Sequence, residues 1–305
     1  MPTFPTSPTV TMDVLLRQPV LISRALTDLS RKRFNIADAV FADAGPDAVA
    51  GGSARYQTSE SIYTADDPIA LALGAEFPRT IWTEAISTAV TNKYGLEFPV
   101  LYETIRRKQY DVMARGMRKV ANSITRFMDA RALAVLDAGG ISTQALTTAW
   151  SAGGADPLKD ISQAATTITT ADEGYVADTV LMSDQTAHVF VNHANVRAVL
   201  PRETDLQFGR SGIIGTIQGK TIVQSPAVPA GFIYVLESKM VGSIADEALA
   251  PEEGYATYDV GDGLNKPVSV RTYEEIQKSQ WVVRGLRVPA MWVAEPLSCV
   301  KVAIA

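Results

Sequence analysis

The chain has 305 residues, and 47% of them are hydrophobic, which is enough to bury the core of one large domain or two ordinary ones. Its 28 basic and 33 acidic side chains give a formal net charge of −5, which argues against a protein that coats nucleic acid over its whole surface. Its single cysteine, Cys299, cannot form a disulfide within the chain, and its apolar neighbours predict a buried thiol. No run of 18 apolar residues and no signal-peptide pattern occurs, so we expect no membrane contact.

Proline dominates the start of the chain, where Pro2, Pro5, Pro8 and Pro19 alternate with threonine and serine. Proline at this density prevents a helix and cannot donate to a central strand, so residues 1–19 are predicted to form an extended arm. We expect the arm to lie along another surface, such as a neighbouring subunit. An amphipathic helix is predicted over residues 20–33, with leucine and isoleucine on one side.

Two β-prone segments follow the first helix. Residues 54–64 are polar and rich in β-forming types, and residues 80–92 alternate with a period of two. The excursion between them contains Pro68, Gly74 and Pro78, so the two segments are predicted to form one long hairpin. Because an isolated two-stranded hairpin is marginally stable in water, this one needs its own domain or a partner to cover it.

A long helix is predicted over residues 101–140. Apolar side chains recur there at steps of three and four, in the pattern of one helical stripe: Ile105, Met113, Met117, Val120, Ile124, Phe127, Met128 and Leu136. The helix would have about 35 residues and a length of roughly 50 Å, so other elements should pack along it. Gly116, in its interior, is a candidate flex point if the helix bends.

The remaining faces of this helix are basic. They carry Arg106, Arg107, Lys108, Arg115, Arg118, Lys119, Arg126 and Arg131. Such a face can contact nucleic acid, can be solvated, or can meet acidic segments of neighbouring subunits. The helix lacks interleaved aromatic residues and a recognition motif, which favours the last two interpretations.

Helices and strands alternate over roughly residues 140–260, which indicates a compact α/β domain. Asp156 and Pro157 are typical of a helix start, and Asp184 is predicted to cap a second helix that ends before Pro201. The predicted elements are helices 157–170 and 185–200, strands 179–183, 214–224, 232–237 and 240–245, and a β-rich segment 267–304.

The sequence contains no recognisable catalytic or metal-binding motif. His188 and His193 are five residues apart, which separates them by about 140° on a helix and disfavours a shared metal ion. The glycines between 209 and 219 match no phosphate-binding pattern, and residues 259–265 lack the final glutamate of a calcium loop. We therefore predict no catalytic, cofactor-binding or metal-binding residues.

The order of these parts resembles that of the major capsid proteins of tailed bacteriophages, whose fold is shared with encapsulin nanocompartments and herpesvirus capsid floors. Four stretches carry the resemblance over essentially the whole chain. They are the junction TNKYGLEFPVLYETIRRK, the strand and helix DTVLMSDQTAHVFVNHANVRAVLP, the strand series GTIQGKTIVQSPAVPAGFIYVLESKMVGSIADEA, and the closing strands QWVVRGLRVPAMWVAEPLSCVKVAIA.

The resemblance implies an α+β fold with an N-terminal arm and short helix (1–52) and an extended hairpin, the E-loop (53–99). It also implies a peripheral domain with the spine helix (100–138 and 265–305) and an α/β axial domain (139–264). The candidates that it implies for contacts between subunits are Arg55, Tyr56, Phe77, Arg79, Trp82, Arg106, Arg107, Arg115 and Arg118.

The function that it implies is a non-enzymatic major capsid protein, which assembles through hexamers and pentamers into an icosahedral shell around double-stranded DNA. The expected partners are further copies of the chain, portal, scaffolding and decoration proteins, and packaged DNA as a nonspecific neighbour. The expected location is the virion, after assembly in the host cytoplasm. The alternatives are an encapsulin-type compartment and, from another class, a soluble α/β enzyme.

Some capsid proteins of this kind cross-link a lysine near the E-loop tip to an asparagine of the next subunit. Residues 64–79 contain no lysine, and the hairpin's only lysine, Lys93, lies near its base. Asn265 fits the acceptor by position alone. We therefore expect the shell to be held together by non-covalent contacts.

Overall fold

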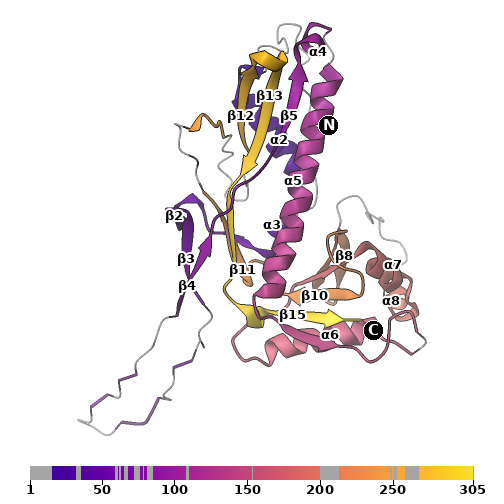
Figure 1. Ribbon diagram of the computed structural model, residues 1–305. Coiled ribbons are helices and arrows are strands. Elements are labelled where there is room, and N and C mark those ends of the chain that lie inside the picture. Colours follow the sequence, from indigo (N-terminus) through magenta and orange to yellow (C-terminus); the bar gives the residue numbers. More distant parts are fainter. Residues whose placement is uncertain are drawn as a thin grey trace.

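The computed structural model describes most of the chain between residues 16 and 304. The described residues are 16–31, 36–58, 61, 63–64, 68–71, 76–77, 79–80, 85–107, 110–152, 154–199, 213–247, 249, 253–257 and 268–304. Figure 1 shows an elongated molecule in which one long helix, α5 (Tyr110–Ala138), runs from an upper lobe to a lower one. The first 15 residues of the predicted arm lie outside the described residues. None of the described helices is long and apolar enough to cross a membrane.

The long helix is shorter than predicted at its N-terminal end. Leu101 is the last residue of strand β5 (Tyr94–Leu101), where it pairs with Gln280. The next helix, α4 (Tyr102–Arg106), ends at a cap on Arg107, and α5 then covers 29 residues. The prediction of a single helix over 101–140 was therefore wrong at its start, because pairing with a strand distant in sequence determines the conformation of Leu101.

The upper lobe is a three-stranded antiparallel sheet covered by helices. Its strands, in spatial order, are β12 (Ser269–Glu275), β13 (Gln280–Arg287) and β5. Helix α5 and the amphipathic helix α2 (Pro19–Arg31) pack on the sheet, as Figure 1 shows. The predicted apolar stripe packs against the C-terminal β-rich segment, through Val268, Val270 and Val283.

Most of the predicted stripe is buried. Met113, Met117, Ile124 and Met128 are at most 5% exposed. Phe127 is the exception, because 46% of its surface is exposed and its ring lies against Tyr94, with the ring centroids 4.7 Å apart. The assignment of Phe127 to the buried stripe was therefore wrong. Its position is at the edge of the stripe, where the sheet covers only one side of the ring.

The lower lobe is built on a six-stranded mixed sheet. In spatial order its strands are β6 (Ser142–Ala145), β15 (Cys299–Ala303), β10 (Phe232–Leu236), β7 (Thr179–Met182), β9 (Lys220–Gln224) and β8 (Ile213–Ile217). Apolar side chains of β10 alternate between two cores: Ile233 and Val235 face one, and Tyr234 and Leu236 face the other. Both faces of the sheet are thus covered, which explains the continuous apolar runs of β7 and β10.

Three helices contribute to the first core: α6 (Pro157–Thr169), α7 (Asp184–Asn192) and α8 (Ala194–Val199). The side chain of Asp156 accepts a hydrogen bond from the Lys159 amide, which confirms the predicted cap of α6. The second core contains the short helix α3 (Ile36–Val40) and the C-terminal end of α5. The second core therefore joins the long helix to the lower lobe.

The predicted helix 185–200 is two helices. Ser183 Oγ accepts the Thr186 amide at 3.1 Å, so the cap is Ser183, and the predicted cap residue, Asp184, is the first residue of α7. His193 has an extended backbone that ends α7, and its Nδ1 atom accepts the Asn195 amide at 3.3 Å at the start of α8. The hydrogen bond to the His193 side chain thus lies at the break between α7 and α8, and the spacing of apolar residues does not predict it.

Two small sheets connect the lobes. One consists of β1 (Ala42–Asp43), β11 (Gly242–Asp246) and β14 (Pro289–Val293). The other consists of β2 (Val49–Ala50), β3 (Ser53–Gln57) and β4 (Ile86–Val90). The antiparallel register of β3 and β4 confirms the predicted hairpin. Three 3-10 turns complete the described elements: η1 (Pro46–Ala48), η3 (Ile276–Lys278) and η4 (Pro296–Ser298).

The last strands of the chain pair across the predicted domain limits. Strand β14 pairs with β11, and β15 pairs with β10 and β6. Two strands that follow residue 265 thus lie in sheets with strands from 139–264. The domain limits themselves stay a prediction.

Candidate functional site

The base of the hairpin is held against its own chain. Ala54, Ala245 and Ala290 are fully buried between the hairpin sheet and the β11–β14 sheet, and such small side chains allow the two sheets to approach closely. Tyr56 stacks on Trp292, with ring centroids 5.4 Å apart and an interplanar angle of 21°. The domain thus covers one face of the hairpin base, which meets the need for cover that the sequence indicated.

Polar contacts hold the short segment between strand β4 of the hairpin and strand β5. The Thr91 amide donates to the Gly52 carbonyl at 3.0 Å, and Thr91 Oγ1 donates to Glu247 Oε2 at 2.9 Å. Lys93 forms an ion pair with Glu253 at 3.2 Å, with both side chains largely exposed. Such an exposed pair contributes at most about 1 kcal/mol, so the buried contacts and the Thr91 bonds position the base.

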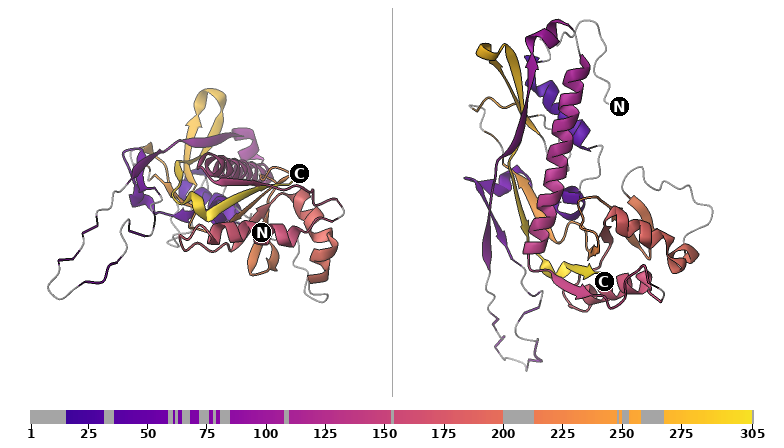
Figure 2. Two further views of the ribbon diagram at one scale, coloured as in Figure 1. Left: turned by 90° about the horizontal axis from the view of Figure 1, so that it is seen from below. Right: turned by 45° about the vertical axis from the view of Figure 1, so that its right-hand side comes forward.

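The distal part of the hairpin extends away from both lobes, as Figures 1 and 2 show for its described residues. Its apolar side chains are strongly exposed: Tyr63 by 59%, Ile69 by 63% and Phe77 by 78%. Tyr63 Oη also donates to Asp172 Oδ1 of the lower lobe, at 3.4 Å. A projecting segment with large exposed apolar side chains indicates a surface that another chain covers.

The outer face of the hairpin sheet is also uncovered. Ile86 and Val90 on β4 are each 65% exposed. Arg55 on β3 lies opposite Thr88, between these two residues, and is exposed. The hairpin sheet therefore has one face that packs within the chain and one face that presents a cation between two aliphatic side chains.

The predicted contact residues fall into two separate groups. Arg55, Phe77 and Arg79 are exposed on the hairpin, whereas Tyr56 contributes to the packing of its own chain and Trp82 lies outside the described residues.

The second group is on the helices. Arg106 and Arg107 are exposed at α4, which Figure 1 places at the far end of the molecule from the hairpin tip, and Arg107 lies 3.9 Å from Glu103. Arg115 and Arg118 are exposed on α5. The structure does not bring the two groups together within one chain.

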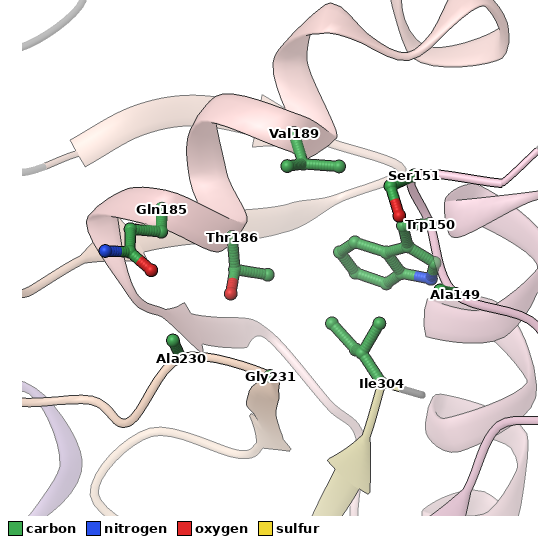
Figure 3. A pocket seen from close by; sticks show the side chains of 9 residues that line it. All are labelled: Ala149, Trp150, Ser151, Gln185, Thr186, Val189, Ala230, Gly231 and Ile304. Atoms are coloured by element: carbon green, nitrogen blue, oxygen red, sulfur yellow. The ribbon is translucent and has the colours of Figure 1, made fainter.

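The lower lobe contains a small, mainly apolar cavity of about 190 Å³. Figure 3 shows Trp150, Thr186 and Ile304 pointing toward the same space, and no ionisable side chain lines it. Trp150 Nε1 donates to Asp160 Oδ2 at 2.9 Å, so its polar atom is already bonded. This cavity offers no group for acid–base or nucleophilic chemistry beyond the hydroxyls of Ser151 and Thr186.

A second, more polar cavity of about 440 Å³ lies between β6 and α6. Asp156, Lys159, Asp160 and Gln144 line it, and Gln144 Oε1 is buried without a hydrogen-bond partner. In the part of the chain that the structure describes, no group of three or more His, Cys, Asp or Glu side chains could hold a metal ion.

The two histidines and Gly219 belong to the lower lobe. His188 is exposed on α7, and His193 is half-buried at the residue between α7 and α8. Gly219 and Gln218 have positive φ values of 74° and 52° in the two-residue turn between β8 and β9. The prediction of one strand over 214–224 was therefore wrong, because the positive φ values of Gln218 and Gly219 reverse the chain and divide this segment into β8 and β9. Glycines 209 and 212 and residues 259–265 lie outside the described residues.

Sequence reasoning missed a partly buried polar cluster where α5 meets the six-stranded sheet. Asp137 Oδ1 accepts hydrogen bonds from Tyr234 Oη at 3.0 Å and from Lys301 Nζ at 2.9 Å. Burial, followed by the bond to Asp137, raises the pKa of Tyr234. Burial also raises the pKa of Cys299, which is fully buried as predicted, so its thiol stays protonated. The cluster joins the end of α5 to the sheet. Its members are far apart in the sequence, so the spacing of residues along the chain does not predict that they meet.

A second missed pair is Arg287 and Asp246. The guanidinium donates twice to the carboxylate, at 2.9 and 2.8 Å, and only 3% of the Arg287 side chain is exposed. These polar contacts are structural. Among the described residues, the hairpin and the basic side of α5 are two exposed surfaces that carry predicted contact residues.

Comparisons with known proteins agree with this architecture. The model of a family described as phage capsid protein matches residues 84–302, more than two thirds of the chain. A comparison with curated proteins finds no match.

Solved structures with the same fold include two shells and one phage capsid. The capsid of the cyanophage P-SCSP1u has a TM-score of 0.64 and 10% identity, with 90% of this chain and 89% of that chain covered. A virus-like particle from Pyrococcus furiosus has a TM-score of 0.57 and 10% identity, with 92% and 98% covered. The holo-SrpI encapsulin complex from Synechococcus elongatus PCC 7942 has a TM-score of 0.58 and 13% identity, with 84% and 83% covered. These similarities confirm the predicted fold class.

Proposed function

Because the chain belongs to the phage capsid protein family, we propose that it assembles through hexamers and pentamers into an icosahedral shell that encloses a double-stranded DNA genome. The chain is a structural capsid protein that forms a shell. The proposal adds how the subunits are arranged in the shell and that the shell contains double-stranded DNA.

The observation that carries the proposal is the exposed hairpin. Phe77, Ile69 and Tyr63 are each more than half exposed on a segment that extends beyond the lobes, while Tyr56 and Ala54 anchor its base. Fully burying one such side chain contributes about 1.5–3 kcal/mol. Repeated at every subunit, contacts of this size add up to a stable closed assembly.

Charged contacts between subunits are the second part of the proposal. Arg55 and Arg79 on the hairpin, and Arg106 and Arg107 at α4, are exposed at opposite ends of the molecule. In a closed shell one end of a subunit meets a different end of its neighbour, so residues that are separated within one chain can form one interface.

We further propose that these contacts are non-covalent. No lysine occurs in residues 64–79, and Lys93 at the hairpin base is in an ion pair with Glu253. Portal, scaffolding and decoration proteins are the proposed additional partners, and the proposed site of assembly is the host cytoplasm. The chain is proposed to have no enzymatic activity, in keeping with the structural role of the phage capsid protein family to which it belongs.

Electron microscopy and sedimentation of the purified full-length chain test the proposal. Closed particles of uniform size, with six-fold and five-fold clusters of subunits, are the expected result. A chain that stays monomeric under all assembly conditions, with and without a scaffolding protein, would contradict it.

An encapsulin-type compartment is a second candidate, supported by the similarity to the SrpI encapsulin complex. The contents of particles isolated from the native host distinguish the two functions. Double-stranded DNA supports the capsid, whereas a single enzyme species packed without DNA supports the compartment.

A further inference from the structure

We propose that the basic stripe of α5, defined as Arg115, Arg118, Lys119 and Arg126, binds the phosphate backbone of double-stranded DNA without reading its sequence. The inference rests on the proposed function, because it assigns this surface to the packaged nucleic acid. It goes beyond that function by naming the residues that make the contact.

The stripe is continuous along one side of the helix. All four side chains are exposed. At 3.6 residues per turn they fall within a sector of about 100° and extend over about 17 Å of the helix. In the right-hand view of Figure 2, α5 lies in front of the upper sheet, and no other element is drawn across its outer side. The stripe can therefore lie against an extended ligand.

Three of the four cations of the stripe, Arg118, Lys119 and Arg126, are not balanced by an anion among the described residues. Residues 112–128 contain no aspartate or glutamate. Asp129, the next carboxylate, is 6% exposed and accepts the Ile36 amide at 2.8 Å at the start of α3. Among the residues that the structure describes, Arg118, Lys119 and Arg126 have no hydrogen-bond or ion-pair partner. These cations are thus available to an anion outside the chain.

Several cations elsewhere on the upper lobe and at the hairpin base are paired with carboxylates. Arg284 lies 3.0 Å from Glu97, Lys278 lies 3.1 Å from Glu275, and Lys93 lies 3.2 Å from Glu253. In a chain whose net charge is −5, the described residues thus include a row of three unpaired cations on α5, Arg118, Lys119 and Arg126. Such a row of cations creates a field that attracts a polyanion to one face of the subunit.

The side chains between the cations favour nucleic acid over an acidic protein. Asn122 and Ser123 separate Lys119 from Arg126, and both are exposed, small and polar. A protein interface is usually anchored by aromatic side chains or arginine in well-packed pockets, and the exposed large apolar side chains of α5, Val112 and Phe127, lie outside the segment between Lys119 and Arg126. Phosphate binding needs only cations in a row, and arginine provides paired donors for phosphate oxygens.

Fluorescence anisotropy with two labelled 20-base-pair duplexes of unrelated sequence tests this inference on the full-length, unassembled chain. The variant Arg118→Gln/Lys119→Gln/Arg126→Gln should bind both duplexes at least about tenfold more weakly at 50 mM salt. The slope of log K against log salt should become less steep by about 2.7, which is 0.9 for each lost phosphate contact. Wild-type binding should be equal for the two sequences.

The matched control removes three cations that are paired with carboxylates, in the variant Lys93→Gln/Arg107→Gln/Lys278→Gln. It changes the net charge by the same amount, and it should keep the wild-type salt slope. Equal losses in both variants, or an unchanged slope in the stripe variant, would overturn the inference. A poly-glutamate peptide that binds the stripe more tightly than the duplex at matched salt would also overturn it, in favour of an acidic protein partner.

Electron microscopy of all three proteins separates this inference from the proposed function. Wild-type shells that form normally while the free chain does not bind the duplexes would refute the stripe's role alone. Absence of wild-type shells under every condition would refute the proposed function.

Discussion

Gly116 shows how one residue sets the distance between α5 and the strand beside it. A Cβ atom at this position would lie 2.8 Å from both Cδ2 and Cε2 of Phe98, which is closer than carbon atoms approach each other. The ring lies on β5 and packs in the upper core. The structure therefore gives Gly116 a packing role. Its proposed role as a flex point of the helix stays a prediction.

The substitution Gly116→Ala should lower the free energy of unfolding by about 1 kcal/mol. Overpacking costs about 1–3 kcal/mol, and the better helix propensity of alanine offsets about 1 kcal/mol of it. Urea denaturation of the unassembled chain measures the difference. The double variant with Phe98→Leu should recover most of the loss, and Asn122→Ala, at an exposed site of the same helix, should be slightly stabilising. A Gly116→Ala chain as stable as wild type would show that the ring moves at no cost.

At the scale of elements, an ion pair fixes how the upper sheet continues into the small sheet that joins the lobes. Arg287 is the last residue of β13, and Asp246 is the last residue of β11. Their two parallel hydrogen bonds occur where the chain passes from β13 to β14, which pairs with β11. Because Arg287 is almost fully buried, its charge depends on this carboxylate.

Removal of the carboxylate in Asp246→Ala should lower the free energy of unfolding by about 3–5 kcal/mol, because a buried guanidinium then loses both charge-assisted hydrogen bonds to this carboxylate. The double variant Asp246→Ala/Arg287→Met should recover most of this loss, because it also removes the buried charge and keeps an apolar stem. Lys278→Ala, which breaks an exposed pair with Glu275, should cost less than about 1 kcal/mol. Urea denaturation measures all three, and equal stability of Asp246→Ala and wild type would contradict the argument.

Element types were predictable from the sequence, whereas element ends were less so. The period of apolar residues identified the long helix and the amphipathic α2, and Asp156 with Pro157 identified the start of α6. Leu101 was misassigned because its conformation depends on Gln280, far away in the sequence. The break at His193 depends on a single side-chain bond. The spacing of apolar residues reflects the average burial of one helix face. It therefore does not locate a helix end that a single contact determines.

At the scale of the whole molecule, the order of parts was predictable but the pairing of its surfaces was not. The sequence indicated that the hairpin needs cover, and the structure shows that Ala245, Ala290 and Trp292 cover its base within the chain. Tyr56 and Phe77 were equivalent candidates in the sequence, yet one stacks on Trp292 and the other is 78% exposed. Which aromatic residue remains for a neighbour depends on tertiary contacts, which a single sequence does not contain.

Substitution of Phe77 should therefore weaken shell assembly without changing the stability of the folded chain. In Phe77→Ser the unassembled chain should keep its free energy of unfolding within about 0.5 kcal/mol, since an exposed side chain contributes little. The protein concentration at which shells form should rise at least about tenfold, because the lost burial at each contact is worth about 1.5–3 kcal/mol and 1.4 kcal/mol corresponds to a factor of ten. Phe77→Leu, which retains an apolar side chain, should assemble nearly as wild type. Light scattering against concentration measures the threshold, and an unchanged threshold in Phe77→Ser would mean that the hairpin tip meets solvent in the shell.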